Sequence, residues 1–279
     1  MTDTYSTLRV SAAGGVAHVV IDNPPVNLLD AALMTDLDRF AGAVARDPEV
    51  RVVVFDSADP DFFVAHGDMR IAQDPVAFAA LDTAPEQDPA LNPMMRLHER
   101  VRALPQITIA KLRGVARGGG AELLSAMDMR FAARERAGLA HPEARMGIIP
   151  GAGATAYLPG LLGRARALEV ILGAGLVDAV TAERIGWVNR AVPGAELDHV
   201  VDTLAARIAA LAPGVARAAV EAVDAAATST AHGLRTADRL LHDLFGTPAA
   251  ARLGRAALAA GAQTREGERH LETLIDNLT

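Results

Sequence analysis

The sequence RGVARGGGAE, residues 113–122, joins an apolar run, Ile107–Ala110, to a helical run, Leu123–Met127. This order predicts a strand, a glycine turn and a helix. Consecutive glycines allow a ligand to approach the backbone closely, and the first N–H groups of a helix have no partner within the helix. We therefore expect the turn to bind a phosphate, a carboxylate or an oxyanion, and the glycines alone favour none of the three.

The composition limits the class of protein. At 279 residues the chain is long enough for one large domain, or for one domain with a helical appendage. A net charge of -7 and a pI of about 5.6 argue against binding to nucleic acid, although an anionic small molecule remains possible. The absence of cysteine excludes disulfides, thiolate nucleophiles and cysteine metal sites.

The sequence contains no recognisable targeting or membrane segment. Residues Met1–Tyr5 are polar and do not resemble a signal peptide. No apolar run reaches the roughly 18 residues that a membrane-spanning helix needs. We therefore expect a cytoplasmic protein without membrane contact.

Hydrophobic periodicity predicts a mixed α/β part followed by an all-helical part. We expect a hairpin of Leu8–Val10 and Val16–Ile21, a helix over Asp30–Arg46 with Asp30 as N-cap, and a buried strand over Val50–Phe55. Further elements are predicted at Met94–Ala103, Met129–Ala133, Ala154–Leu158 (ended by Pro159), Ala165–Gly173, Thr181–Ile185 and Val188–Val192. Gln73–Asn92, which contains three prolines, is predicted to be a variable segment.

The last part of the chain is rich in alanine and leucine. Helices are predicted at Leu197–Ala212, Val215–Ala227, Gly233–Phe245 and Pro248–Ala260. We place a boundary near residue 200, which divides the chain into residues 1–200 and residues 201–279.

Two glutamates are candidates for acid–base chemistry. Glu122 lies in the first turn of the helix after the glycines, where a carboxylate also suits the helix dipole or a capping box. Glu143 follows Pro142 in a loop, where a carboxylate is most often simply solvated. A pair of carboxylates beside one pocket can share acid and base roles. A second glycine turn, at Gly67, offers either a plain strand-to-helix turn or another donor for an oxyanion.

Five segments, taken in order, resemble the crotonase (enoyl-CoA hydratase/isomerase) superfamily. They are Asn23–Leu28, Phe63–Met69, Arg113–Leu123, His141–Glu143 and Ile148–Thr155. The resemblance covers residues 8–195, and it departs from the family at His66, where glycine is usual, and in the tail, Pro248–Thr279.

The resemblance implies a spiral of strand–strand–helix units, here residues 1–200, with a C-terminal helical region, residues 201–279, that packs homotrimers or hexamers. It implies an acyl-CoA substrate and no metal or redox cofactor, since coenzyme A enters as part of the thioester. The implied reaction is hydration of an enoyl-CoA. The alternatives are another acyl-CoA reaction of the family (isomerisation, decarboxylation or thioester hydrolysis) and a non-catalytic acyl-CoA-binding protein.

The resemblance also implies roles for individual residues. Backbone N–H groups of Gly67 and Gly119 would polarise the thioester carbonyl. Glu143 would donate a proton at the α-carbon, and Glu122 would orient or deprotonate the water that adds at the β-carbon. The N–H of Gly151 would hold that water. Contacts to coenzyme A are implied for Pro25, Val26, Leu28, Ala65, Asp68, Met69 and Arg70.

Overall fold

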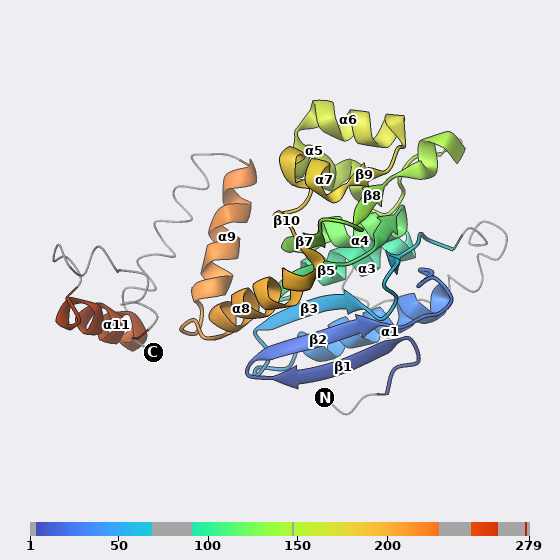
Figure 1. Cartoon of the computed structure of the whole chain (residues 1–279). Coiled ribbons are helices and arrows are strands. Elements are labelled where there is room, and N and C mark those ends of the chain that lie inside the picture. Colours follow the sequence, from blue (N-terminus) through green and yellow to red (C-terminus); the bar gives the residue numbers. More distant parts are fainter. Residues whose placement is uncertain (1–3, 69–90, 147, 229–246, 262–276, 278–279) are drawn as a thin grey trace. The chain divides into compact units, whose positions relative to one another are not determined.

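The computed structural model describes residues 4–68, 91–146, 148–228, 247–261 and 277. The chain forms two compact units, Met1–Ala209 and Ala210–Thr279 (Figure 1). The predicted boundary near residue 200 falls inside helix α8, Leu197–Ala209. This helix buries Leu197, Val201 and Ala205 and packs against strands of the first unit, so the division follows its last residue.

The larger of two sheets forms the centre of the first unit. Its six strands are β1 (Leu8–Ala13), β2 (Val16–Ile21), β3 (Val52–Ser57), β5 (Ile107–Leu112), β7 (Met129–Ala133) and β10 (Arg190–Val192), in the order β1-β2-β3-β5-β7-β10. Only β1 and β2 pair antiparallel, which confirms the predicted hairpin. The other pairs are parallel, and the apolar part of β3 is buried as its sequence predicts.

A smaller sheet runs beside the first and produces the repeating unit of the fold. It contains β4 (Phe62–Val64), β6 (Val115–Arg117), β8 (Gly138–Ala140) and β9 (Val177–Asp178). Successive strands alternate between the sheets, so that β3 is followed by β4, β5 by β6 and β7 by β8. A helix follows each pair, which confirms the predicted spiral of strand–strand–helix units. Periodicity did not reveal these short strands, because two or three residues carry no measurable alternation.

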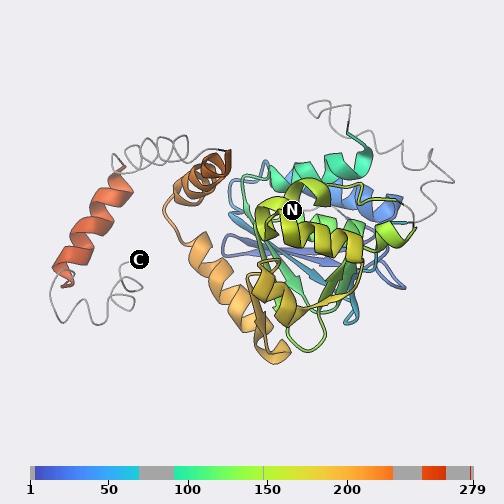
Figure 2. The same cartoon turned by 90° about the horizontal axis from the view of Figure 1, so that it is seen from above.

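The helices of the first unit cover the sheets. They are α1 (Ala31–Val44), α3 (Pro93–Arg102), α4 (Gly119–Ala126), α5 (Ala154–Leu162), α6 (Arg164–Gly173), α7 (Ala179–Ile185) and α8, with short 3₁₀ turns η2 (Pro142–Met146) and η3 (Gly194–Glu196). Asp30 caps α1 as predicted, because its Oδ1 accepts the N–H of Leu33 at 2.9 Å. Helix α3 packs against α1 and α4, while α5, α6 and α7 gather near β8 and β9 (Figures 1 and 2).

The prediction that Pro159 ends its helix was wrong. Helix α5 continues to Leu162 with Pro159 inside it. Proline removes its own N–H, but its carbonyl still accepts the N–H of Gly163 at 3.1 Å, so the following turn closes. The missing hydrogen bond is therefore a local loss and does not end the helix.

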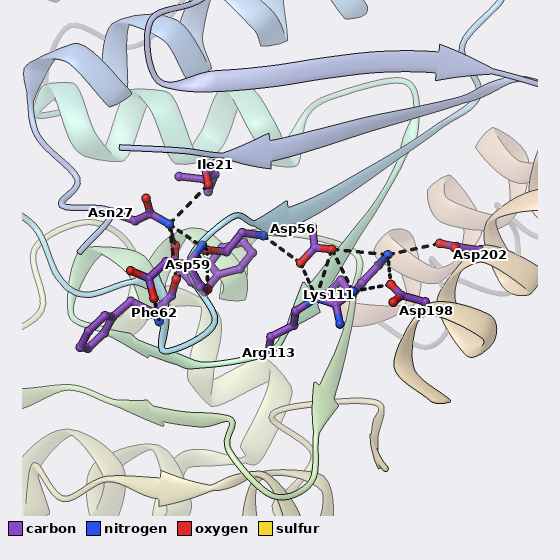
Figure 3. A network of polar contacts seen from close by, with 11 residues as sticks. Ile21, Asn27, Asp56, Asp59, Phe62, Lys111, Arg113, Asp198 and Asp202 are labelled. Atoms are coloured by element: carbon purple, nitrogen blue, oxygen red, sulfur yellow. Dashed lines mark hydrogen bonds and ion pairs between the residues drawn. The ribbon is translucent and has the colours of Figure 1, made fainter. Parts of the chain in front are cut away.

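A network of charges ties helix α8 to the large sheet (Figure 3). Lys111 on β5 lies 2.7 Å from Asp198, 3.3 Å from Asp202 and 3.5 Å from Asp56 on β3. Arg113 pairs with Asp56 at 3.1 Å and with Asp198. We call these five residues the Lys111 network. Burial, the largest effect, lowers the pKa of Lys111, but the hydrogen bond to Asp198 and the aspartate charges outweigh it and raise the pKa overall.

The second unit contains helices α9 (Val215–Thr228) and α11 (Pro248–Ala259), close to their predicted bounds. The predicted helix Gly233–Phe245 lies wholly outside the described residues, and the variable segment Gln73–Asn92 also does, except for its last two positions. In the part of the chain that the structure describes, no helix has the length and apolar character required to cross a bilayer.

Candidate functional site

The three consecutive glycines are required by the space around them. Gly118 is the N-cap of α4 and has a φ of 47°, which few side chains tolerate. A Cβ at Gly118 would lie 2.9 Å from Glu143 Oε1, and a Cβ at Gly120 would lie 2.6 Å from the carbonyl oxygen of Val64. Any side chain here would displace either the second glutamate or strand β4.

The two predicted oxyanion donors lie next to each other. A Cβ at Gly119 would be 3.5 Å from the backbone nitrogen of Gly67. Gly67 is held by a parallel bridge to Leu29, in which Leu29 donates to the carbonyl of His66 at 3.0 Å. Within the described residues, neither Gly67 N–H nor Gly119 N–H donates a hydrogen bond. An oxyanion hole requires two neighbouring backbone donors of this kind, so the two N–H groups remain candidates for that role.

Glu122 does not cap its own helix. Its side chain is 2% exposed, and its Oε1 accepts the N–H groups of Ala152 at 2.8 Å and Ala154 at 3.0 Å. Ala154 is the first residue of α5, so the carboxylate lies at the positive end of a different helix. The capping-box interpretation, in which Glu122 caps its own helix α4, was therefore wrong. The N-cap of α4 is Gly118, which has no side chain, and the Glu122 carboxylate accepts hydrogen bonds at the start of α5 instead.

The environment of Glu122 disfavours the ionised form of its carboxyl group relative to the same group in water. Burial is the main cause and raises the pKa of the carboxyl group. The hydrogen bonds from Ala154 and Ala152 lower the pKa and offset part of this effect, and the charge of Glu143 adds to the rise. A buried carboxyl group with a raised pKa is a candidate for proton transfer.

Glu143 lies beside Gly118. It belongs to the 3₁₀ turn η2 after strand β8, and its Oε2 is 3.6 Å from Nδ1 of the fully buried His141. The His141 ring stacks on Trp187 at a centroid distance of 5.4 Å. Glu143 Oε2 and both nitrogens of His141 have no hydrogen-bond partner among the described residues. The structure thus brings Glu143 next to Gly118, the N-cap of the helix that carries Glu122, and the charge of Glu143 acts on the Glu122 carboxyl group.

The remaining predicted site residues fall into two groups. Gly151 is exposed and precedes Ala152, so it lies beside the hydrogen bond that holds Glu122. Pro25, Val26 and Leu28 follow β2 and run beside Ala65–Asp68, because Ala65 donates to the Val26 carbonyl at 3.2 Å and Asp68 donates to the Leu29 carbonyl at 3.1 Å. Both of these N–H groups are therefore committed within the protein. Met69 and Arg70 lie outside the described residues.

His66 adds a polar ring to the first oxyanion turn. Its Nδ1 lies 2.7 Å from the carbonyl oxygen of Gly67, and it is half-buried. Because a carbonyl oxygen only accepts, Nδ1 must carry the proton. This hydrogen bond uses the carbonyl oxygen of Gly67 and not its N–H. The His66 side chain therefore does not occupy the N–H that is predicted to bind the oxyanion.

Helix α3 supplies site residues that the sequence did not indicate. His98 is fully buried, with Nδ1 2.8 Å from the carbonyl oxygen of Ala152. Asn92 donates from Nδ2 to the carbonyl of Gly151 at 2.7 Å. The sulfur of Met94 would lie 2.9 Å from a Cβ at Gly119. Amphipathic periodicity predicts such a helix but cannot identify its polar contacts, which depend on the position of a loop more than 50 residues away.

No group of three or more histidine, aspartate or glutamate side chains in the described ranges is arranged to hold a metal ion. The residues that the structure brings together at the candidate site are those with neighbouring backbone N–H groups, Gly67 and Gly119, and the two glutamates, Glu122 and Glu143.

The fold and the site together define the class of protein: a two-sheet spiral, two neighbouring backbone N–H groups, the buried Glu122 and the half-buried Glu143. The chain belongs to the enoyl-CoA hydratase/isomerase family, whose match covers residues 11–260. The family supports a CoA thioester as the kind of substrate.

Individual relatives and solved structures agree with this assignment. A protein from Rhizobium meliloti (strain 1021) named "Probable enoyl-CoA hydratase" is 33% identical over 88% of this chain and 91% of its own length. The structure of "a putative enoyl-CoA hydratase" from Streptomyces avermitilis is 48% identical, covers 99% of both chains and superposes with a TM-score of 0.73. The enoyl-CoA hydratase structure from Bacillus anthracis is 28% identical, covers 90% of this chain and 95% of its own, and has a TM-score of 0.80.

Proposed function

We propose that this protein is an enoyl-CoA hydratase that adds water across the 2,3-double bond of an enoyl-CoA thioester. One observation carries the proposal: the N–H groups of Gly67 and Gly119 lie together, and both glutamates flank the glycine turn beside them. Relatives named as hydratases support the same reaction.

The N–H groups of Gly67 and Gly119 would bind the thioester carbonyl oxygen. Addition of water to the β-carbon pushes electrons onto that oxygen, so the donors stabilise the enolate more than the substrate. Removal of one such donor typically costs about 3 kcal/mol of transition-state stabilisation. Glycine suits both positions because a side chain at Gly67 would meet Met94, and a side chain at Gly119 would meet Met94 and Leu29.

The two glutamates would move the protons. Ionised Glu122 takes a proton from water as the water oxygen bonds to the β-carbon. Protonated Glu143 gives its proton to the α-carbon as the enolate collapses and the carbonyl re-forms. The sum is the addition of one water molecule, after which the two carboxyl groups have exchanged protonation states. No oxidant, reductant or metal is required for this balance.

The structure supports different roles for the two carboxyl groups. Glu122 is held at one oxygen by the N–H groups of Ala152 and Ala154, which leaves the other oxygen for the water. The N–H of Gly151 precedes these donors and would give the water a second contact. Glu143 has an oxygen without a described partner and lies beside the glycine turn that would hold the carbonyl.

The segments around Pro25–Leu28 and Ala65–Asp68 would bind coenzyme A, and Met69 and Arg70 would extend this contact. Because Ala65 and Asp68 already use their N–H groups, a contact to the backbone of these two residues would be made through the carbonyl oxygens. We further propose a cytoplasmic homotrimer or a hexamer of two trimers. Light scattering should give a mass that is a multiple of three chains, and a stable monomer would contradict this part.

Incubation with crotonyl-CoA and longer enoyl-CoA substrates tests the function. We expect loss of the enoyl absorbance and a product heavier by one water in mass spectrometry. Chromatography separates double-bond isomers, and free coenzyme A would indicate thioester hydrolysis. Glu122→Gln is the matched control, since its amide oxygen still accepts from Ala152 and Ala154. Binding without turnover at any chain length would favour a non-catalytic acyl-CoA-binding protein and would overturn the proposal.

A further inference from the structure

Helix α3 contacts both halves of the candidate site. Met94, in its first turn, lies against Gly67 and Gly119. Asn92, its N-cap, and His98, in its second half, reach the loop before α5. A single helix therefore touches the oxyanion donors and the loop that holds Glu122.

The two loop contacts are made to successive carbonyl groups. Asn92 Nδ2 donates to the Gly151 carbonyl at 2.7 Å, and His98 Nδ1 donates to the Ala152 carbonyl at 2.8 Å. The N–H of Ala152, which shares a peptide group with the Gly151 carbonyl, donates to Glu122 Oε1 at 2.8 Å. Side chain, loop and carboxylate thus form one continuous hydrogen-bonded chain from α3 to the proposed base.

The hydrogen bond to the Ala152 carbonyl is the one polar contact of the His98 ring among the described residues. The ring is fully buried, and its Nε2 has no partner among the residues described. Burial is the main cause that lowers the pKa of His98 to about 4, so the ring is neutral at pH 7. Its single proton must lie on Nδ1, because that nitrogen faces a carbonyl oxygen.

We propose that Asn92 and His98 are positioning residues that fix the Gly151–Ala154 loop. In this position the N–H groups of Ala152 and Ala154 hold Glu122 towards the attacking water, and the N–H of Gly151 faces the same water. This inference rests on the proposed hydratase function. Neither residue touches the substrate; each acts through a loop carbonyl. Misplacement of a catalytic group by about 1 Å can lower a rate about 100-fold, so the loop position matters for turnover.

Two pairs of variants separate positioning from general stability. His98→Leu removes the donor, whereas His98→Asn places an amide nitrogen near the position of Nδ1. Asn92→Asp keeps the oxygen that caps α3 through the N–H of Met95 at 2.9 Å, but cannot donate to Gly151. Val101→Ala, at another buried position of α3, is the control for lost packing alone.

Hydration kinetics give the first readout. We expect His98→Leu and Asn92→Asp to lower kcat about 10-fold to 100-fold with KM nearly unchanged, and His98→Asn to recover most of the rate. Val101→Ala should lower thermal stability and leave kcat close to the wild type. Equal losses in His98→Leu and Val101→Ala, or no rescue by His98→Asn, would overturn the proposal.

Amide hydrogen exchange in the free protein gives a second readout that needs no activity. The N–H groups of Ala152 and Ala154 should exchange about 10-fold faster in folded His98→Leu than in the wild type or in His98→Asn. Unchanged exchange would overturn the positioning role even if the protein hydrates enoyl-CoA. If the wild type has no hydratase activity, the proposed function fails, while faster exchange still supports the loop contact itself.

Discussion

The Lys111 network and the candidate site both place charged groups inside the first unit, but they satisfy them differently. Lys111 is 5% exposed at its side chain and faces three aspartates, two of which are about half exposed. The cations and anions of the Lys111 network lie in direct contact (Figure 3). At the candidate site, Glu122 is buried without a cation in hydrogen-bond contact among the described residues, and polar atoms of His98, His141 and Glu143 lack described partners.

The difference indicates what each region is built for. A buried polar group without a partner costs about 1–3 kcal/mol, so the candidate site lowers the stability of the fold. The Lys111 network joins α8 to β3 and β5 and leaves no comparable cost at Lys111. Unpaired buried groups are expected where a ligand completes the interactions, and paired groups where the fold itself needs them.

The largest expected effect comes from Glu122→Gln. We expect kcat for hydration to fall about 10³-fold, because the amide keeps the hydrogen bonds to the α5 terminus but cannot accept a proton. The melting temperature should be unchanged or higher, since burial raises the pKa of Glu122 and thus disfavours its ionised form. Steady-state kinetics and calorimetry on the same preparation measure both. A large fall in stability would show that Glu122 belongs with the structural charges.

The pH dependence of stability should reveal the buried His98. Burial lowers its folded pKa from 6.5 to about 4, so the unfolded chain binds this proton between pH 6.5 and 4 while the folded chain does not. Stability from this group is complete above pH 6.5 and falls as the pH drops towards 4, by about 3 kcal/mol. Urea unfolding across this range should show a flatter acid limb in His98→Asn than in the wild type.

A matched control for His98 is His199→Asn, which changes an exposed histidine on α8. This variant should keep the acid limb of the wild type. Glu122 acts in the opposite sense, because a carboxyl group with a raised pKa loses stability as the pH rises through that pKa. Glu122 is present in both the wild type and His98→Asn, so its pH-dependent contribution to stability cancels when the two are compared. An identical acid limb in the two proteins would contradict the burial of a neutral His98 ring.

Lys111→Met tests the structural side of the comparison. The change leaves Asp56, Asp198 and Asp202 without their shared ammonium group. Removal of one partner of a buried pair costs 3–5 kcal/mol, but the exposed aspartates are screened by water, so we expect a loss of about 2 kcal/mol in urea unfolding. The kcat of the folded protein should stay within about twofold of the wild type. A fall in kcat that exceeds the fall in stability would show that the network also serves the site.

Sequence periodicity predicted most of the fold because the long elements carry a strong signal. The hairpin, the cap of α1 at Asp30 and the strand at Met129–Ala133 were all predicted from local pattern. The short strands β6, β8 and β9 and the continuation of α5 past Pro159 were not, because tertiary pairing rather than local pattern decides them. The spiral itself came from the resemblance and is confirmed by the alternation of strands between two sheets.

The candidate site was less accessible to sequence reasoning. The glycine turn indicates a close approach to the backbone, but it does not reveal that Gly67 lies beside Gly119. Glu122 in a first helical turn suggests a cap, and only the structure shows that its partners, Ala152 and Ala154, belong to another helix. His98 had no sequence signal, since a histidine on an amphipathic helix becomes informative only when the loop opposite it is known. The catalytic roles of the glutamates and glycines stay predictions.

The smallest expected effect is that of Asp202→Asn. Asp202 is 49% exposed at its side chain, and its Oδ1 lies 3.3 Å from Lys111 Nζ, while Asp56 and Asp198 remain in contact with the same ammonium group. The loss in urea unfolding should be about 0.5 kcal/mol and should shrink further in about 0.5 M salt, because an exposed pair is screened. A loss equal to that of Lys111→Met would mean that the network depends on every contact, and redundancy of pairing would then no longer distinguish it from the candidate site.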